Sequence, residues 1–306
     1  MRVLILGATG FIGFPVAQAF VRAGHIVYGQ TRSAAKAKQL AAEEIIPVVA
    51  DTQDTASYLP PLIPKLDAII DAVGGTDIRT LSATLLSATA DAIKTYRPPT
   101  ASKLVYIYTS GTWVHGENRD EAMSDGSPLG AMAELISWRP AHEQRVISNP
   151  DLNGIVIRPS LLYGRSGSIL ALFFRKAHTE GKVEWPGTPG GRLALIHCDD
   201  LAELYVLAAE KAAIARGQIF DGTNDVNEST DAFLQRLVEI SGAKGPYQYT
   251  EPTNLFEKAL STTSILRPYL GRALLGWRPR KAGLLDHLDI YYQAWKASEG
   301  LSQSTL

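Results

Sequence analysis

Gly7-Ala8-Thr9-Gly10-Phe11-Ile12-Gly13 follows directly on the apolar run Arg2-Val3-Leu4-Ile5-Leu6 and precedes a stretch that can form a helix. This context places the glycines at a strand-to-helix turn. Gly7 permits a tight turn, Gly10 lets the main chain approach a pyrophosphate, and Gly13 lets the helix pack closely on the strand, with its positive end facing the phosphates. The sequence therefore predicts a dinucleotide site contacted by Gly7, Thr9, Gly10, Phe11, Ile12 and Gly13.

The composition and charge are those of an ordinary globular chain. Its 306 residues are 45% hydrophobic, which suits one large domain or a domain with a smaller lobe. The net charge is −1, without a basic stripe or an acidic tail, so we expect neither nucleic acid nor an anionic membrane as partner. No run approaches the roughly 18 apolar residues that span a bilayer, and no signal segment precedes the first strand. We therefore expect a cytoplasmic protein.

Short β-branched runs alternate with longer stretches of helical character along the chain. Such alternation is typical of a doubly wound parallel sheet of the Rossmann type. Helices are expected at 11–23, which ends at Gly24, and at 77–96, which Pro98-Pro99 terminates. The predicted strands are Val3–Leu6, His25–Gly29, Ile46–Val49, Ala68–Asp71, Leu104–Tyr108 and Ile155–Ile157.

The rest of the sequence predicts a second, smaller lobe. Residues 160–192 mix glycine, proline and aromatic residues in a way that suits pocket walls better than a sheet. Residues 193–197 look like a return strand that leads into another helix. We therefore expect a dinucleotide-binding core at 1–160, completed by about 193–223, and a small C-terminal substrate lobe at 161–192 and 224–306.

The residues after the second predicted strand bear on the choice of cofactor. Where a ribose-binding carboxylate would select NAD, the sequence has Gln30-Thr31-Arg32-Ser33, with Lys36 one turn later. A guanidinium pairs with a 2′-phosphate, whereas an unpaired carboxylate there would repel it. The sequence therefore favours NADP, with NAD as the second choice; the alternative interpretation is that Arg32 is simply exposed to solvent.

Polar and small residues at the ends of later strands are expected to face the same pocket. Asp51-Thr52 follows the third strand, where a carboxylate can accept a hydrogen bond from an adenine amino group. Ala72-Val73-Gly74 follows the fourth strand, where small residues leave room for the cofactor. Pro159, which closes the sixth strand, is expected to contact the cofactor as well. The alternative is that these are ordinary strand-ending residues, which are common in any such sheet.

Further motifs occur in a characteristic order after the glycine turn. The chain carrying them resembles the extended short-chain dehydrogenase/reductase superfamily, essentially from end to end. The resemblance implies a Rossmann core with a small substrate lobe, and activities such as nucleotide-sugar epimerisation, dehydration and ketone reduction. It also implies a homodimer formed through two long helices, here 77–96 and 130–148. The motifs are Asp71-Ala72-Val73-Gly74, Tyr108-Thr109-Ser110-Gly111-Thr112, Arg158-Pro159-Ser160 with Tyr163-Gly164, His197-Cys198-Asp199-Asp200-Leu201-Ala202 and Leu275-Gly276-Trp277-Arg278-Pro279.

The chain departs from the family at the catalytic signature. The family uses a Ser or Thr after the fifth strand, and a Tyr followed four residues later by Lys. Ser110, helped by Thr112, can fill the first role, but Leu135 and Arg139 occupy the positions of the tyrosine and the lysine. Leucine cannot donate a proton, and arginine can hold the nicotinamide ribose without relaying one, because its pKa is above about 12. The chain is therefore predicted to be an atypical member.

A reductase without this acid needs another proton donor, since a positioned acid contributes roughly a hundredfold to ten-thousandfold in rate. His115 stands close behind Ser110, and an imidazole exchanges protons near neutral pH. The alternative is a packed histidine without chemistry. Tyr163 should face the same crevice, either as the acid or as a cleft wall. His142, beside Glu143, is expected at the helix surface.

The expected crevice is rich in aromatic side chains and poor in cations. Its positive groups reduce to Arg165 and Arg192, fewer than a sugar-nucleotide pyrophosphate would need. Aromatic walls favour an aromatic or apolar ligand, unless half of these rings are ordinary core. They are Trp113, Trp138, Tyr163, Phe173, Phe174 and Trp185.

These observations support three functions, in decreasing order. The first is an NADP-dependent reductase of a small aromatic carbonyl or conjugated metabolite, with a non-standard proton donor. The second is a nucleotide-sugar epimerase or dehydratase. The third is a non-catalytic regulator that binds NADP(H). We predict no metal site.

Overall fold

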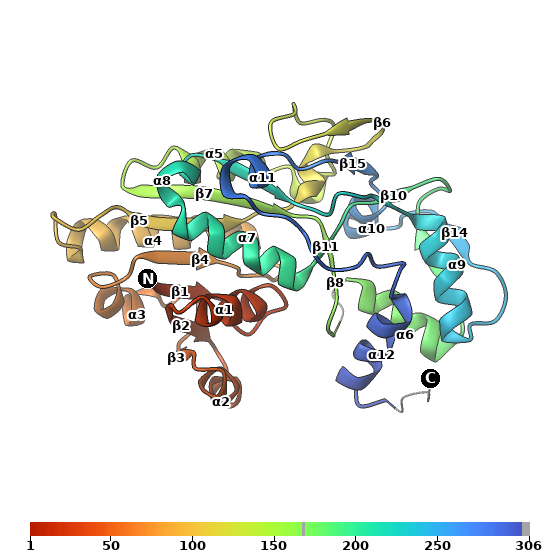
Figure 1. Ribbon diagram of the computed structural model, residues 1–306, viewed down its shortest axis with the longest axis horizontal. Helices are drawn as coiled ribbons and strands as arrows, with labels where there is room; N and C mark the ends of the chain where they lie inside the picture. The colour runs from red at the N-terminus through yellow and green to blue at the C-terminus, as the bar shows by residue number, and fades with distance from the viewer. Residues whose placement is uncertain (167–168, 302–306) are drawn as a thin grey trace.

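The computed structural model describes residues 1–166 and 169–301. Its centre is a parallel sheet of seven strands in the order β12-β7-β5-β4-β1-β2-β3 (Figure 1). The strand order reverses beside β1, so the carboxyl ends of β1 and β4 open a crevice at that point. The strands are β1 (Arg2–Leu6), β2 (Ile26–Thr31), β3 (Ile46–Val49), β4 (Ala68–Asp71), β5 (Leu104–Thr109), β7 (Leu152–Pro159) and β12 (Ile219–Gly222).

The six strands predicted from the sequence are all present, within a few residues of their expected bounds. The return strand predicted at 193–197 is present, but it lies outside the central sheet. It is split into β10 (Arg192–Leu193) and β11 (Leu195–His197), which pair with β13 (Glu228–Ser229) and β8 (Leu161–Tyr163) in separate two-stranded sheets. The seventh strand of the sheet is β12 instead, paired with β7.

Helices cover both faces of the sheet, because the side chains of each strand alternate between two apolar cores. In β1, Val3 and Ile5 join the core under one helical layer, and Leu4 and Leu6 join the core under the other. The first layer holds α1 (Gly13–Arg22), α2 (Ala34–Ala42), α7 (Cys198–Glu210) and α8 (Ala212–Ala215), and the second holds α3 (Thr55–Leu62), α4 (Ile78–Tyr96) and α5 (Arg139–Ile147).

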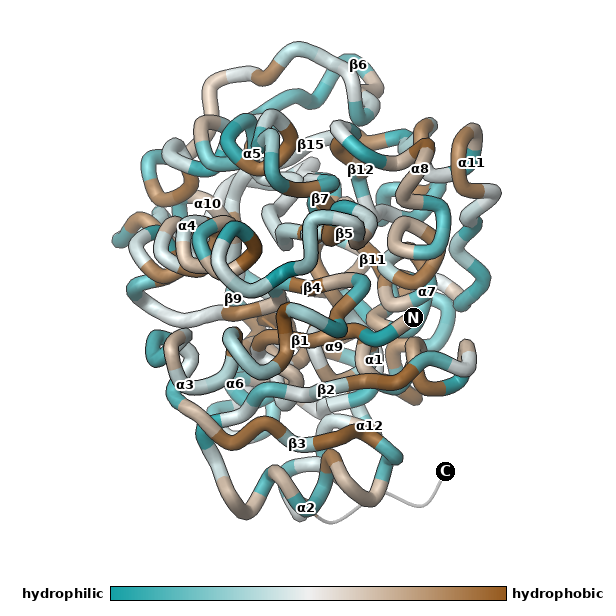
Figure 2. Tube along the Cα trace, turned by 90° about the vertical axis from the view of Figure 1, so that its left-hand side faces the viewer, coloured by the Kyte–Doolittle hydropathy of each residue, from teal (hydrophilic) through white to brown (hydrophobic). Residues whose placement is uncertain are grey.

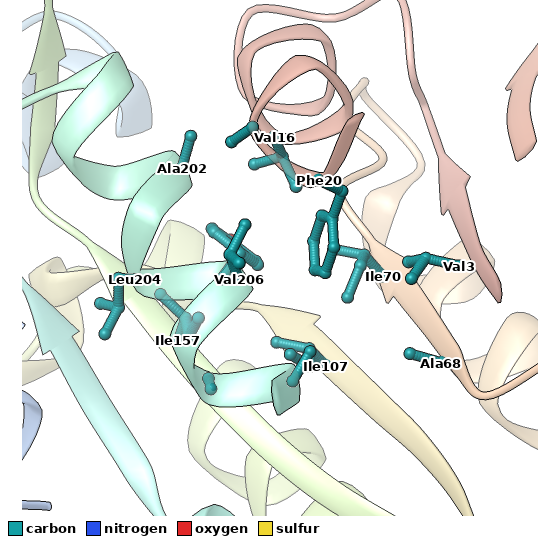
Figure 3. Packing of buried hydrophobic residues seen from close by; sticks show 14 of the residues in the cluster. Val3, Val16, Phe20, Ala68, Ile70, Ile107, Ile157, Ala202, Leu204 and Val206 are labelled. Atoms are coloured by element: carbon teal, nitrogen blue, oxygen red, sulfur yellow. The ribbon is translucent and has the colours of Figure 1, made fainter. Parts of the chain in front are cut away.

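The contact between α1 and α7 lies at the centre of the first core (Figure 3). Val16 and Phe20, one helical turn apart on α1, point toward the strands, where Phe20 lies beside Ile70. Val206 of α7 packs beside them, and all four side chains are buried. The close approach of α1 to the sheet follows from the glycine turn that precedes it.

The remaining elements form a lobe beside the carboxyl ends of the strands, at the right of Figure 1. A third apolar core fills it, drawn from residues 161–195 and 233–301. One part of the segment 224–306 does not belong to this lobe as expected. The helix α11 (Leu270–Leu275) and Trp277 pack instead on the core that α7 covers. The other elements are β6 (Asn118–Met123), β9 (Glu184–Pro186), β14 (Gln248–Thr250), β15 (Ser264–Leu266), α6 (Leu170–Glu180), α9 (Thr230–Ser241), α10 (Leu255–Leu260) and α12 (Leu288–Ser298).

One of the two helices expected at a dimer interface is shorter than predicted. The helix expected at 77–96 is present as α4, but 130–148 contains only a short 3-10 turn, Glu134–Ile136, before α5 begins at Arg139.

Figure 2 shows the hydropathy along the chain. Hydrophobic residues, in brown, run along β2 and β3, whereas β6 is largely hydrophilic. No helix in the described part of the chain has both the length and the apolar character needed to cross a bilayer.

Candidate functional site

The glycine turn after β1 is too tight for larger residues. Gly7 has a φ of +75°, and a Cβ at this position would lie 2.7 Å from the carbonyl oxygen of Ala72. A Cβ on Gly13 would lie 2.1 Å from the carbonyl oxygen of Gly7. The turn therefore requires glycine at both positions, as the sequence predicts for a main chain that approaches a pyrophosphate.

A cleft of about 390 Å³ opens beside this turn, along the ends of β1, β2 and β4. It contains ten of the residues predicted to bind the cofactor: Gly7, Thr9, Gly10, Arg32, Lys36, Asp51, Thr52, Ala72, Val73 and Gly74. The cleft lining does not include five others, namely Phe11, Ile12, Gly13, Arg139 and Pro159. It adds Gln30, Thr31, Gln53 and Leu81, which the sequence-based prediction of the site lacks.

Gln30 is the most informative of the added residues. Its side chain is 1% exposed, accepts a hydrogen bond from the Gly7 amide at 3.1 Å and donates to the carbonyl of Ala50 at 2.8 Å. It therefore ties the glycine turn to the segment after β3. A polar side chain at the end of an otherwise apolar strand is the sequence signal that could have identified it.

Arg32 and Lys36 bring two cations to the side of this cleft formed by the end of β2 and by α2. Both side chains are exposed, and neither has a carboxylate within 4 Å among residues 1–166 and 169–301. Ser33 caps α2 between them, because its hydroxyl accepts from the Lys36 amide at 3.3 Å. Asp51 is exposed on the same cleft and accepts from the Gln53 amide at 2.8 Å. An anion placed beside Arg32 would therefore meet positive charge that no neighbour neutralises.

Asp71 ends β4 and directly precedes the small residues that line the cleft, Ala72, Val73 and Gly74. Its carboxylate accepts from the Val73 amide at 3.3 Å and from the Tyr106 hydroxyl at 3.1 Å, so it fixes the turn that carries the small residues. Burial raises the pKa of Asp71 to about 6, against the opposing effect of these two hydrogen bonds and of the Arg139 charge.

Ser110 follows β5, as predicted, and is bound to a buried ion pair. Its hydroxyl donates to the Glu143 carboxylate at 2.5 Å. The same carboxylate accepts two hydrogen bonds from the Arg158 guanidinium, at 2.6 and 3.0 Å. A serine has one hydroxyl proton, so Ser110 can donate to a substrate oxygen only if it leaves Glu143.

Replacement of Glu143 with glutamine is expected to destabilise the protein by roughly 3 kcal/mol, because the buried Arg158 charge then keeps only the more distant Asp221 carboxylate, 3.9 Å from its Nη1. Glu143 is 1% exposed and Arg158 is 3% exposed. Urea denaturation measures the effect. Glu239→Gln, at an exposed pair with Arg236, serves as the control and is expected to cost less than about 1 kcal/mol. Equal losses of unfolding free energy in the two variants would contradict the view that the buried pair of Glu143 and Arg158 stabilises the fold.

The two predicted substitutes for the missing acid are both buried and occupied. His115 is 0% exposed, and its Nε2 lies 2.8 Å from the Asp221 carboxylate. Tyr163 is 1% exposed; its hydroxyl donates to the carbonyl of Ala282 at 2.8 Å and accepts from the Asn224 amide at 3.0 Å. Burial also raises the pKa of Tyr163. In this structure both side chains are therefore packed inside the chain and bonded to other residues.

Arg139 begins α5 and reaches the end of β5. Its Nη1 donates to the Tyr108 hydroxyl at 2.9 Å and to the carbonyl of Thr109 at 3.3 Å. The guanidinium lies 4.9 Å from the centre of the Trp138 ring. Leu135, at the position of the family's tyrosine, lies in the turn before α5 and is 38% exposed. At the positions of the family's lysine and tyrosine the structure therefore presents a cation, Arg139, and an aliphatic side chain, Leu135.

His142 is buried, so its expected place at the helix surface is wrong. Its ring packs edge-on against Tyr108, 4.6 Å between centres, and 6.1 Å from Trp138. Burial lowers the pKa of His142 to about 4, with smaller contributions from Arg145 and Arg139. The imidazole is therefore neutral at physiological pH.

This pKa predicts an acid-sensitive fold. The unfolded chain takes up the His142 proton near the ordinary pKa of 6.5, and the folded chain only near 4, so stability falls as the pH drops between these values. The loss amounts to about 3 kcal/mol at most. His142→Phe keeps a ring against Tyr108 and is expected to flatten this pH dependence in thermal or urea unfolding, whereas His178→Gln, at an exposed histidine, should not. An unchanged slope in His142→Phe would contradict the account.

The predicted aromatic crevice is largely wrong. Tyr163, Phe174 and Trp185 lie in the core of the lobe, and Phe173 stacks on Trp185 at 4.5 Å. Trp138 lies beside Arg139. The rings of the lobe belong to segments that lie beside the expected crevice, but they pack together and fill the apolar core of the lobe.

A small cavity remains between the core and the lobe, with a volume of about 20 Å³. Of the predicted residues, Thr112, Trp113 and Arg192 line it. Thr112 is 4% exposed, and Arg192 is exposed. The other expected cation, Arg165, binds Asp199 at 2.6 Å and Gln18 at 2.7 Å instead. A ligand larger than a water molecule or two requires these walls to move apart.

Comparison with known proteins places this geometry in a family. Residues 3–221 match the model of the NAD dependent epimerase/dehydratase family. A 3-diazoavenalumate denitrifying reductase from a Streptomyces species is 26% identical, over 94% of this chain and 99% of that protein. An uncharacterised protein from Schizosaccharomyces pombe is 23% identical over 95% of this chain and 100% of its own length.

Two solved structures show the same fold with NAD bound. The dTDP-glucose 4,6-dehydratase of Bacillus anthracis has a TM-score of 0.81 at 14% identity, covering 98% of both chains. The UDP-glucuronic acid 4-epimerase of Bacillus cereus has a TM-score of 0.76 at 18% identity, covering 97% of this chain and 100% of that one. With its Rossmann sheet, its glycine turn and a family match over more than two thirds of its length, the chain belongs to the NAD dependent epimerase/dehydratase family, within the extended short-chain dehydrogenase/reductase class.

Proposed function

We propose that the protein is an NADP-dependent reductase of a small conjugated or aromatic carbonyl-like metabolite. The observation that carries the proposal is the pair of unneutralised cations, Arg32 and Lys36, in the cofactor cleft of a family that binds nicotinamide dinucleotides. The Streptomyces relative, which aligns with nearly the whole chain, is named a 3-diazoavenalumate denitrifying reductase and supports the same class of reaction.

The residues of the cleft fit an NADP molecule. The glycine turn would hold the pyrophosphate, since Gly7 and Gly10 face the cleft with main chain and no side chain. Arg32 can pair with a 2′-phosphate through its planar fork, and Lys36 adds a second positive charge. Asp51 and Thr52 lie where they can accept from the adenine, and the turn at Val73 and Gly74 leaves space for the nicotinamide half.

A bound nicotinamide cofactor supplies hydride, and this chain would supply orientation rather than a strong acid. Arg139 offers fixed hydrogen-bond donors beside Tyr108. Ser110 and Thr112 remain candidates for contacting the substrate oxygen, with Ser110 released from Glu143. His115 and Tyr163 are not part of this proposal, because both are buried and bonded elsewhere. The proton would come from solvent.

The proposal is tested by two measurements on purified protein. Fluorescence titration should show saturable binding of NADPH that is tighter than binding of NADH. Incubation with enones, quinones and aromatic ketones should then oxidise NADPH in stoichiometric amounts, followed at 340 nm. Saturable NADPH binding with no turnover of any of these compounds would favour a regulator, and sugar-nucleotide conversion without net cofactor oxidation would favour an epimerase. Absence of binding to folded protein would refute the proposal.

A further inference from the structure

Arg139 is a partly buried cation that its neighbours hold in one orientation. The two hydrogen bonds it donates, to the Tyr108 hydroxyl and the Thr109 carbonyl, both leave from Nη1. The Trp138 ring stacks on the guanidinium at 4.9 Å, and His142 packs against Trp138 and Tyr108. A planar group held by stacking on one side and hydrogen bonds at one corner loses little freedom when it binds a ligand.

No carboxylate neutralises this cation. No acidic oxygen of the described residues lies within 4 Å of Arg139, and its Nε and Nη2 donate to no atom of the described chain. The two buried carboxylates whose charge reaches this region are engaged elsewhere. Asp71 binds the Val73 amide and Tyr106, and Glu143 binds Ser110 and Arg158. Nε and Nη2, on the other side of the fork, therefore have no hydrogen-bond acceptor among the described residues.

We propose that Arg139 binds an anionic group of the substrate, a carboxylate carried on a planar conjugated or aromatic frame. The inference rests on the proposed reductase function and names its substrate class. A carboxylate meets the fork in two parallel charged hydrogen bonds and neutralises it, whereas a neutral ribose hydroxyl leaves the charge uncompensated. Trp138 beside the fork offers a flat surface for the conjugated frame. The cofactor ribose, which the family resemblance assigns to this position, is the competing ligand.

Cinnamate, a planar carboxylate, and cinnamamide, its neutral counterpart, serve as probes in isothermal titration calorimetry, with and without NADP⁺. Wild-type protein is expected to bind cinnamate at least about tenfold more tightly than cinnamamide. Arg139→Met should lose this difference while its dissociation constant for NADP⁺ stays within about twofold. Arg145→Met, which removes an exposed arginine from the same helix, should behave as wild type. Circular dichroism checks that each variant is folded.

Arg139→Lys keeps the charge but loses the planar fork, so it provides a second variant should the methionine disturb the fold. It is expected to bind cinnamate several-fold more weakly than wild type and NADP⁺ equally well. A variant that loses affinity for NADP⁺ by tenfold and keeps cinnamate binding would overturn the proposal in favour of the ribose. So would NADP⁺ binding by wild type without saturable cinnamate binding. Wild type that binds cinnamate but no cofactor would refute the reductase function and leave the anion site standing.

Discussion

Replacing Arg32 with aspartate is expected to weaken NADPH binding by about tenfold to a hundredfold and to strengthen NADH binding. Arg32 is exposed on the cofactor cleft, and no carboxylate of the described chain pairs with it. Charged hydrogen bonds contribute roughly 1.5–3 kcal/mol, and about 1.4 kcal/mol corresponds to a tenfold change in affinity. The introduced carboxylate repels a 2′-phosphate and accepts from a ribose hydroxyl, so the ratio of the two affinities should change on the order of a hundredfold.

Parallel titrations of NADPH and NADH, followed by the fluorescence of the dihydronicotinamide, measure this ratio. Arg22→Asp is the matched control, because Arg22 is an exposed arginine at the end of α1 and lies outside the cleft lining. It makes the same change in net charge and should leave the ratio as in wild type. If Arg32→Asp also leaves the ratio unchanged, the 2′-phosphate does not bind beside Arg32.

Gly13→Ala is expected to destabilise the protein by at least about 4 kcal/mol and to abolish cofactor binding. The added methyl group would lie 2.1 Å from the carbonyl oxygen of Gly7 and 2.8 Å from its carbonyl carbon. Both atoms belong to the main chain, so relief requires α1 to move away from β1. Such a movement opens the turn that would face the pyrophosphate and breaks the packing of Phe20 on the sheet.

Urea denaturation of the cofactor-free protein separates the loss of stability from the loss of binding. Gly126→Ala is the control, since a methyl group there meets no heavy atom within 4 Å. This variant should differ from wild type by less than about 1 kcal/mol. Wild-type stability in Gly13→Ala would contradict the close contact between Gly13 and Gly7.

The parts of the molecule that could be predicted from the sequence are those with a local cause. The strands at Ile46–Val49 and Ala68–Asp71 have the predicted bounds, because short apolar runs between polar breaks leave little choice of register. Most of the predicted residues that line the cleft could be named for a similar reason, since they follow strands whose ends meet at one edge of the sheet.

The contacts of His115 and Tyr163, the two candidate proton donors, could not be predicted, because their hydrogen-bond partners lie far away in the chain. His115 pairs with Asp221, which is 106 positions away, and the Tyr163 hydroxyl binds the carbonyl of Ala282, which is 119 positions away. The sequence around His115 or Tyr163 contains no pattern that indicates these partners. The hydrogen bond from Ser110 to Glu143 likewise depends on how α5, which carries Glu143, packs on the sheet.

The order of strand pairing has a consequence for synthesis on the ribosome. When the chain has emerged as far as Gly222, all seven strands of the central sheet are available, and the dinucleotide half can fold. The partners of β6, β9 and β10 are still missing, because β15, β14 and β13 all come later. A nascent polypeptide would thus complete its central sheet and glycine turn first and its second lobe last, with apolar surface of the unfinished lobe exposed to chaperones in between.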